Sequence, residues 1–146
     1  MTAIPEQLSK FLAEEKSAVL SVAVDSNGTL HSAALLFVHQ EGPLRISFVT
    51  NKNTEKCKML INGGARKAAC VVGTTKNTPF TLQMRGKLKI VDTSAHRADL
   101  ELYIKKFPNG PDDINEEDNV LLQFIPTWSR YIDYQKGYDR HMLEVD

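Results

Sequence analysis

Hydrophobic and polar positions in the first third of the chain form one helical pattern followed by strand-like alternation. Three strand-like segments lie at 18–24, 29–38 and 44–50, where Val, Ala, Leu and Ile are frequent. Asn27-Gly28 separates the first two segments and Gly42-Pro43 the next two, and both pairs are typical of tight turns. Four apolar residues ahead of these strands share one helix face: Ile4, Leu8, Phe11 and Leu12. The pattern predicts an N-terminal helix and a three-stranded antiparallel meander.

The rest of the chain predicts two further helices and four further strands. The helices are expected over about 53–62 and 93–107, and the strands over 66–73, 80–91, 120–125 and 130–134. In the later helix, Ala95, Ala98 and Leu102 are expected to face inward. Gly86 inside the long strand predicts a bulge or a sharp bend of the kind that closes a barrel. These elements predict a small barrel capped by helices, with a sandwich as the alternative.

Length and charge narrow the class of protein. The chain has 146 residues, which favours a single domain over residues 1–146. Its 18 basic and 18 acidic residues cancel, so the sequence predicts no general attraction to nucleic acid or to an anionic membrane. No apolar run approaches the roughly 20 residues that span a bilayer, and the N-terminus has no secretion-signal pattern. We therefore expect a cytoplasmic protein.

Common catalytic and metal-binding patterns are absent from the sequence. The four histidines lack metal-ligand spacing, so we expect no metal site. Cys57 and Cys70 are too few for a disulfide framework, and we interpret both as small apolar residues. The chain has no Gly-x-Ser-x-Gly elbow, no Gly-x-Gly-x-x-Gly turn and no Walker-type loop, so no catalytic acid, base or nucleophile is assigned.

The junction between the third strand and the next predicted helix is the strongest candidate for a ligand site. The strand ends at Thr50, and the polar loop Asn51-Lys52-Asn53 leads into a helix that carries Thr54 and Lys56. Unpaired N–H groups at a helix start favour an anion, and hydroxyl and ammonium groups add donors and charge. These features predict a phosphate cradle. A capped surface helix with solvated lysines remains the alternative at this level.

The same junction resembles a segment of a known family. The stretch Phe48–Lys56, read Phe-Val-Thr-Asn-Lys-Asn-Thr-Glu-Lys, resembles the Phe-Tyr-Thr-Asn-x-x-Ser-x-Lys segment of the pyridoxamine 5′-phosphate oxidase-like split barrels. The order of elements around it also fits, and Trp128–Tyr138 is similar to the end of small general-stress-type members. The resemblance implies a mainly β (α+β) fold: a six- to seven-stranded antiparallel split β-barrel with short flanking helices. It also implies a homodimer with two FMN sites at the interface.

The resemblance also implies roles for individual residues. Thr50, Thr54 and Lys56 would contact the FMN phosphate, with Asn51 in the same loop, and Val49 would pass near the flavin ring or ribityl chain. Four residues of the facing strand would run along the ring and offer it backbone groups: Ser32, Ala33, Ala34 and Leu35. Apart from the resemblance, the large flat ring of Trp128 could stack near a flavin, but a packing or interface role is the favoured interpretation.

Two departures from the family pattern shape the expected function. Ser32 stands near the position where many pyridoxamine phosphate oxidases have an arginine, and the C-terminal Arg-x-His-Asp arrangement is absent. We therefore expect an FMN-binding oxidoreductase that acts on a small molecule other than a B6 vitamer. Two alternatives stay open: a deazaflavin-dependent reductase, and a non-catalytic module that binds or senses flavin or haem, or that holds no cofactor.

Overall fold

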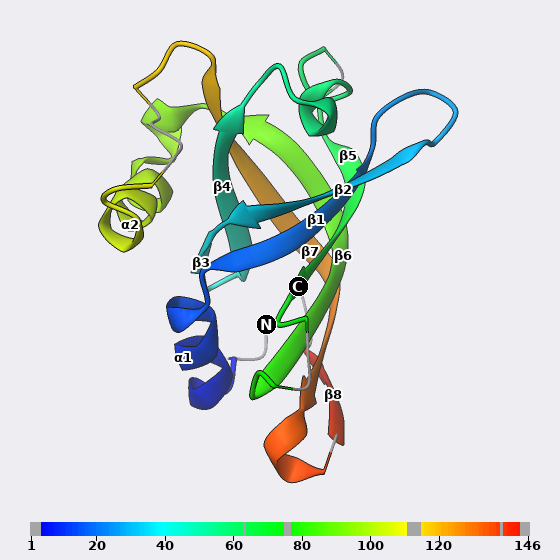
Figure 1. Ribbon diagram of the computed structural model, residues 1–146, viewed down its shortest axis with the longest axis vertical. Coiled ribbons are helices and arrows are strands. Elements are labelled where there is room, and N and C mark those ends of the chain that lie inside the picture. Colours follow the sequence, from blue (N-terminus) through cyan, green and yellow to red (C-terminus); the bar gives the residue numbers. More distant parts are fainter. Residues whose placement is uncertain (1–3, 63, 75–76, 111–114, 138, 144–146) are drawn as a thin grey trace.

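The computed structural model describes residues 4–62, 64–74, 77–110, 115–137 and 139–143 (Figure 1). Its helical elements are α1 (Glu6–Glu14), α2 (Arg97–Lys106) and the short 3₁₀ turns η1 (Glu55–Cys57), η2 (Thr93–Ala95) and η3 (Tyr134–Lys136). Its strands are β1 (Ser17–Ala23), β2 (Leu30–Leu36), β3 (Val38–Gln40), β4 (Arg45–Asn51), β5 (Arg66–Val72), β6 (Phe80–Val91), β7 (Asn119–Asp133) and β8 (Asp139–Leu143). The predicted mainly β fold with short helices is confirmed, with eight strands in one sheet rather than six or seven.

The sheet is antiparallel throughout, and its two edges are joined by a single residue. The strands follow the order β2-β1-β5-β6-β7-β4-β3, with β8 added beside β7. Although β2 and β3 lie at opposite ends of this order, only Phe37 separates them in sequence, and its side chain is fully buried. The sheet must therefore curl until its two edges meet at Phe37. Figure 1 shows this curl, with β2 and β3 close together. The result is the predicted split barrel, not a sandwich.

Three strand predictions need correction. The segment 29–38 is not one strand, because the chain leaves β2 at Leu36 and enters β3, on the other edge of the sheet, at Val38. The meander is also wrong, since β4 pairs with β3 and β7 and not with β2. The segments 120–125 and 130–134 belong to the single strand β7, which runs through Pro126.

A β-bulge explains how β7 accommodates that proline. Arg85 lies opposite Trp128 and Gly86 lies opposite Pro126, so Thr127 is the extra residue of β7. A Cβ atom on Gly86 would lie 2.1 Å from the carbonyl oxygen of Ile125 and 2.7 Å from the Cα atom of Pro126. The bend predicted at Gly86 is therefore confirmed, and only glycine permits the two backbones to approach this closely.

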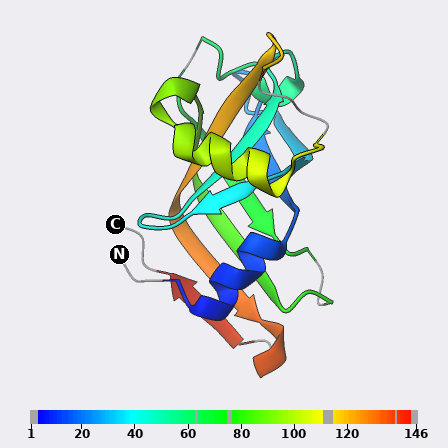
Figure 2. The same cartoon turned by 90° about the vertical axis from the view of Figure 1, so that its left-hand side faces the viewer.

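The core is divided between the inside of the barrel and the space beneath α2. The main cluster fills the barrel, and α1 contributes Leu8, Phe11 and Leu12 to it. A second cluster lies between α2 and the outer face of β4 and β7: Val38, Val49, Val91, Tyr103 and Leu121. Both helices lie on the same side of the molecule, with the β3–β4 hairpin between them (Figure 2).

The inward face of α2 differs from the prediction. Ala95, Ala98 and Leu102 are exposed, whereas Asp99 and Tyr103 are buried. Asp99 can be buried because the Gln123 side-chain amide donates a hydrogen bond to it (3.1 Å) and the Arg45 Nε lies 3.6 Å from it. The apolar pattern of α2 therefore predicted the wrong face, because the acidic residue Asp99 faces the sheet.

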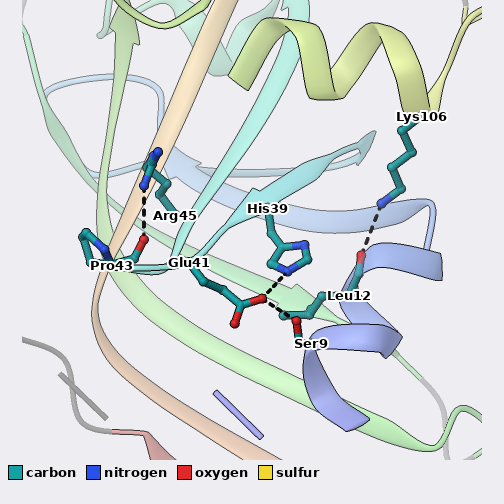
Figure 3. A network of polar contacts seen from close by, with 7 residues as sticks. All are labelled: Ser9, Leu12, His39, Glu41, Pro43, Arg45 and Lys106. Atoms are coloured by element: carbon teal, nitrogen blue, oxygen red, sulfur yellow. Dashed lines mark hydrogen bonds and ion pairs between the residues drawn. The ribbon is translucent and has the colours of Figure 1, made fainter. Parts of the chain in front are cut away.

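Polar contacts tie α1 to the edge of the barrel (Figure 3). Glu41 accepts hydrogen bonds from Ser9 of α1 and from His39 Nε2, the latter at 2.9 Å. The Lys106 ammonium of α2 donates to the carbonyl oxygens of Leu12 (3.2 Å) and Glu15 (2.5 Å). It also lies 4.2 Å from the ring centroid of Phe37. Lys106 therefore joins both helices to the closure of the sheet.

Replacing Gly86 should destabilise the protein. We expect Gly86→Ala to lower the free energy of unfolding by about 1–3 kcal/mol, because the new methyl group meets backbone atoms of β7 that cannot move aside. Urea unfolding measures the change. The exposed neighbour Lys87 gives the control, since Lys87→Ala should change stability by less than about 0.5 kcal/mol. Equal effects of the two substitutions would contradict the close approach at the bulge.

Lys106 should give the protein a distinctive dependence of stability on pH. Burial lowers the pKa of Lys106 from 10.5 to about 8, partly offset by the Glu15 carboxylate. Between these two values the unfolded chain binds more protons than the folded chain, so stability rises with pH. We expect the urea midpoint to increase between about pH 7.5 and about pH 9.

The upper limit of this pH range is set by the two buried thiols, Cys57 and Cys70, because burial raises the pKa of each. Burial raises the pKa of the Cys70 thiol from 9.0 to about 12, which makes stability fall as pH rises above 9. In Lys106→Met the increase between pH 7.5 and pH 9 should disappear, whatever the absolute stability of the variant. The same slope in both proteins would show that Lys106 does not titrate in this range.

Candidate functional site

The loop after β4 folds on itself through short polar contacts instead of starting the predicted helix. The Asn51 side-chain oxygen accepts a hydrogen bond from the Asn53 N–H (2.8 Å), and the Thr54 hydroxyl donates to the Asn51 carbonyl oxygen (2.8 Å). Only Glu55–Cys57 is helical, and it is a 3₁₀ turn. The helix predicted over 53–62 is therefore wrong, and the loop has no α-helix start whose dipole would favour an anion.

Lys56 is the buried cation of this loop. Its side chain is 7% exposed, and its ammonium donates to the Thr54 hydroxyl at 3.0 Å. The other two lysines nearby are exposed to water and lie close to carboxylates: Lys52 is 3.5 Å from Asp118, and Lys58 is 2.8 Å from Glu55. Lys56 thus differs from its neighbours in being held in place beneath the surface, which favours a structural or ligand-binding role over simple solvation.

The fold brings the Lys56 loop beside the strand Ser32–Leu35. The 3₁₀ turn η1 contacts both β1 and β2, although η1 and β2 are separated by β3 and β4 in sequence. Within β2, Ser32 and Ala34 are exposed, whereas Ala33 is half-buried and Leu35 packs against the main core. The Ser32 hydroxyl lies 2.7 Å from the Ser21 hydroxyl of β1. The structure therefore places the two predicted parts of the site next to each other.

Thr50 and Val49 lie inside the fold. Thr50 is 4% exposed at the end of β4, where it pairs with Val120. The Val49 side chain belongs to the cluster beneath α2, so a ligand in front of β4 can meet Val49 only through its backbone. Of the two threonines predicted to hold a phosphate, Thr54 is thus the one in direct contact with Lys56.

Burial keeps the thiol beside this loop protonated. Cys57 is fully buried, and its sulfur lies 3.7 Å from both the Thr54 hydroxyl and the Asn51 carbonyl oxygen. Desolvation raises the pKa of Cys57, and the Thr54 hydrogen bond and the Lys56 charge oppose this only in part. Cys57 is therefore a packing residue of the loop, as predicted. Among the described residues no group of three or more His, Cys, Asp or Glu could hold a metal ion.

Trp128 lies on the outer face of the sheet with two arginines over its ring. The guanidinium carbon of Arg85 is 4.1 Å from the ring centroid and that of Arg130 is 5.6 Å away. Arg130 also donates two hydrogen bonds to the Gln83 side-chain oxygen, at 3.1 and 2.6 Å. These four residues help to line a hollow of about 390 Å³ over β1, β5, β6 and β7.

Strand register explains why these residues meet. Arg85 pairs with Trp128 and Gln83 pairs with Arg130, so all four side chains project from the same face. Arg130 was not among the predicted site residues, because its pairing with Gln83 depends on the continuous strand β7. Residue alternation along β6 was the signal available in the sequence, since it places Gln83 and Arg85 on one face.

A single chain does not bring Trp128 to the Lys56 loop. A continuous row of paired residues crosses the sheet from Ser32 through Ser21, Ala69 and Arg85 to Trp128. Four strand spacings separate the ends of this row, which is about 19 Å along the sheet. Trp128 and Ser32 therefore lie at opposite ends of this row.

Comparisons with known proteins find matches to this chain by structure and not by sequence. No family model matches the sequence, and no curated protein matches it. General Stress Protein 26 from Bacillus anthracis superposes with a TM-score of 0.68 at 17% identity, over 94% of this chain and 97% of that one. A pyridoxamine 5′-phosphate oxidase-related, FMN-binding protein from Nostoc punctiforme gives a TM-score of 0.65 at 16% identity, over 99% and 100% of the two chains.

The fold is that of the pyridoxamine 5′-phosphate oxidase-related split barrels. The resemblance inferred from Phe48–Lys56 is thus confirmed for the fold. A heme-binding protein from Mycobacterium smegmatis has the same split barrel, with a TM-score of 0.71 at 12% identity. That superposition covers 98% of this chain and 60% of the mycobacterial one. No helix in the described part of the chain is long and apolar enough to cross a membrane.

Proposed function

We propose that this protein binds FMN, with the flavin phosphate at Lys56 and Thr54, and that it is a flavin-dependent oxidoreductase. The observation that supports this most is the buried Lys56 ammonium, held by the Thr54 hydroxyl and placed beside the exposed strand β2. The Lys56 ammonium can donate a charge-assisted hydrogen bond to a phosphate oxygen. Neighbouring folds that include an FMN-binding protein support the choice of anion.

The hydrogen-bond donors of this site fit a phosphate and would bind it with modest affinity. Lys56 offers a charged donor, whereas the Thr54 hydroxyl already donates to the Asn51 carbonyl oxygen and serves mainly to orient Lys56. Ser32 and Ser21 add a neutral hydroxyl pair where an arginine would have added charge. We therefore expect FMN to bind reversibly. Bound FMN would supply the hydride and electron chemistry, while the residues of the chain bind and orient it.

We propose further that the protein acts as a homodimer. The hollow lined by Gln83, Arg85, Trp128 and Arg130 is open in the single chain, and Trp128 lies four strand spacings along the sheet from Ser32. A second copy packed over this face would bury a tryptophan and an arginine, the residue types that contribute most to protein interfaces. It would also bring the Trp128 of one chain towards the Lys56 loop of the other.

The role of Lys56 is tested by comparing two flavins that differ only in the phosphate. Lys56→Met keeps the side-chain volume and should weaken FMN binding by about 1.5–3 kcal/mol, because a charge-assisted contact is lost. Riboflavin, which has no phosphate, should bind equally to both proteins, and this also shows that the variant is folded. Fluorescence titration measures both affinities.

Lys52→Met is the matched control, since Lys52 lies in the same loop but pairs with Asp118 at the surface. It should leave FMN affinity unchanged. If Lys56→Met weakened FMN and riboflavin equally, the phosphate role would be refuted. If the purified protein showed the single strong Soret band of haem and not the two visible bands of a flavin, the haem-binding alternative would replace the proposal.

The dimer is tested by sedimentation at micromolar concentration. We expect a dimer, and we expect Trp128→Glu to raise its dissociation constant about thirtyfold or more, which corresponds to about 2 kcal/mol for a central interface tryptophan. Leu102→Glu is the control, because Leu102 is 40% exposed on α2, away from this face. A monomeric wild-type protein would remove the two-chain site, and equal effects of both substitutions would place the interface elsewhere.

A further inference from the structure

A cluster of basic side chains lies on the outer face of β5 and β6, beyond the Trp128 hollow. These two strands contain no acidic residue and five basic ones: Arg66, Lys67, Arg85, Lys87 and Lys89. Four of the five project outward, and Arg66 is paired with Leu88 on the inner face. In a chain whose 18 basic and 18 acidic residues cancel, this is a marked local excess of positive charge.

The register places like charges directly opposite each other. Lys67 pairs with Lys87 across β5 and β6, an arrangement in which Cβ atoms lie about 4.5–5.5 Å apart and like charges destabilise the sheet. Lys89 follows Lys87 on the same face, about 7 Å along the strand. Within the described part of the chain, no ion pair involves Lys67, Lys87 or Lys89.

The lysines line two adjoining hollows. The larger, of about 450 Å³, is lined by Lys67, Arg85 and Lys87, with the side chain of Leu30, which is 75% exposed, on its wall. The smaller, of about 160 Å³, adds Lys89 and the partly exposed Ile125. Three ammonium groups around the two adjoining hollows favour a molecule that carries more than one negative charge. The apolar walls offer a surface for an uncharged part of that molecule.

We propose that this face binds a small organic oligophosphate, with two or more linked phosphates on Lys67, Lys87 and Lys89 and its organic part against Leu30. Lysine ammonium groups bind phosphate as compact point charges, and adjacent phosphates match the closely spaced lysines. Lys56 lies in the loop after β4 and not on β5 or β6, so the lysines of this site differ from the lysine of the proposed flavin site, although Ser21 also lines the larger hollow. The proposal does not depend on FMN binding.

Inorganic tripolyphosphate and ATP are the probes, and isothermal titration calorimetry is the measurement. Both should bind saturably to the wild-type protein and more weakly as salt is added, whereas orthophosphate should bind far more weakly than either. The double variant K67Q/K87Q should lose about tenfold or more in affinity for both probes. K10Q/K136Q removes the same charge from exposed lysines of α1 and η3, and should bind both probes as the wild type does.

The variants also separate binding from folding. K67Q/K87Q relieves a like-charge pair, so it should unfold at the same temperature as the wild type or higher. Tripolyphosphate should raise the melting temperature of the wild type and not that of K67Q/K87Q. If the organic part is recognised, Leu30→Ser should weaken the binding of ATP but not that of tripolyphosphate. If Leu30→Ser bound both probes as tightly as the wild type does, the ligand would be limited to inorganic oligophosphate.

Three results would overturn the proposal. The first is the absence of saturable binding of tripolyphosphate at millimolar concentration. The second is equal affinity of K67Q/K87Q and K10Q/K136Q, which would show only a general effect of net charge. The third is dissociation of a dimer by K67Q/K87Q, which would make the lysine face a contact between subunits.

Discussion

The closure of the sheet at Phe37 is the constraint on which the rest of the structure depends. β2 and β3 form the two edges of the sheet, and a linker of one residue leaves no length for the chain to travel between distant edges. The sheet therefore has to curl until both edges meet. Phe37 is fully buried at the join, and its N–H donates to the Lys16 carbonyl oxygen at 3.2 Å. The barrel thus closes through one connection and not through a ladder of strand pairing.

Closure also determines which segments become neighbours. With β3 held against β4 and β2 held against β1, the loop after β4 is carried to the opposite edge of the sheet, where η1 meets β1 and β2. The Lys106 ammonium lies over Phe37 and binds the last carbonyls of α1, so both helices stabilise the same join. The site around Lys56 is therefore a consequence of barrel closure, and residues far from it can affect it by loosening the join.

The sequence predicted the strands well and their partners less well. Alternation located β1, β5 and β6 closely, because each buries mainly one set of alternate residues. β4 was located from its apolar content and flanking turns, since it is buried on both faces from Ile46 to Thr50. It could not show that one residue carries the chain between edges at Phe37, since apolar residues continue across the break. Pro126 suggested a boundary inside β7, but the bulge opposite Gly86 removes the need for a proline N–H. Pairing depends on contacts distant in sequence, which periodicity does not report.

Prediction of the site likewise succeeded for local features and failed for features that depend on strand pairing. The Phe48–Lys56 motif located a loop in which Thr54 and Lys56 are in contact, and resemblance linked it to Ser32–Leu35. The expected helix failed, because Asn51 and Thr54 bond to the nearby backbone and give a 3₁₀ turn. Arg130 and the lysine face could not be recognised from the chain alone. Each depends on strand register, which pairs Arg130 with Gln83 and Lys67 with Lys87.

The bulge at Gly86 makes two functions on one sheet face compatible. It falls between the Arg85–Trp128 row, proposed to meet a second copy, and the Lys87–Ile125 row, proposed to bind oligophosphate. A bulge bends the strand and increases its twist between the two rows, while the hollows on either side share Ser21, Ala69 and Arg85. Thr127, the extra residue, lines both lysine hollows and none of the Trp128 hollow. A partner whose contacts end at Arg85 would leave Lys67, Lys87 and Lys89 open to solvent, and their positive charge would then remain available to an anion.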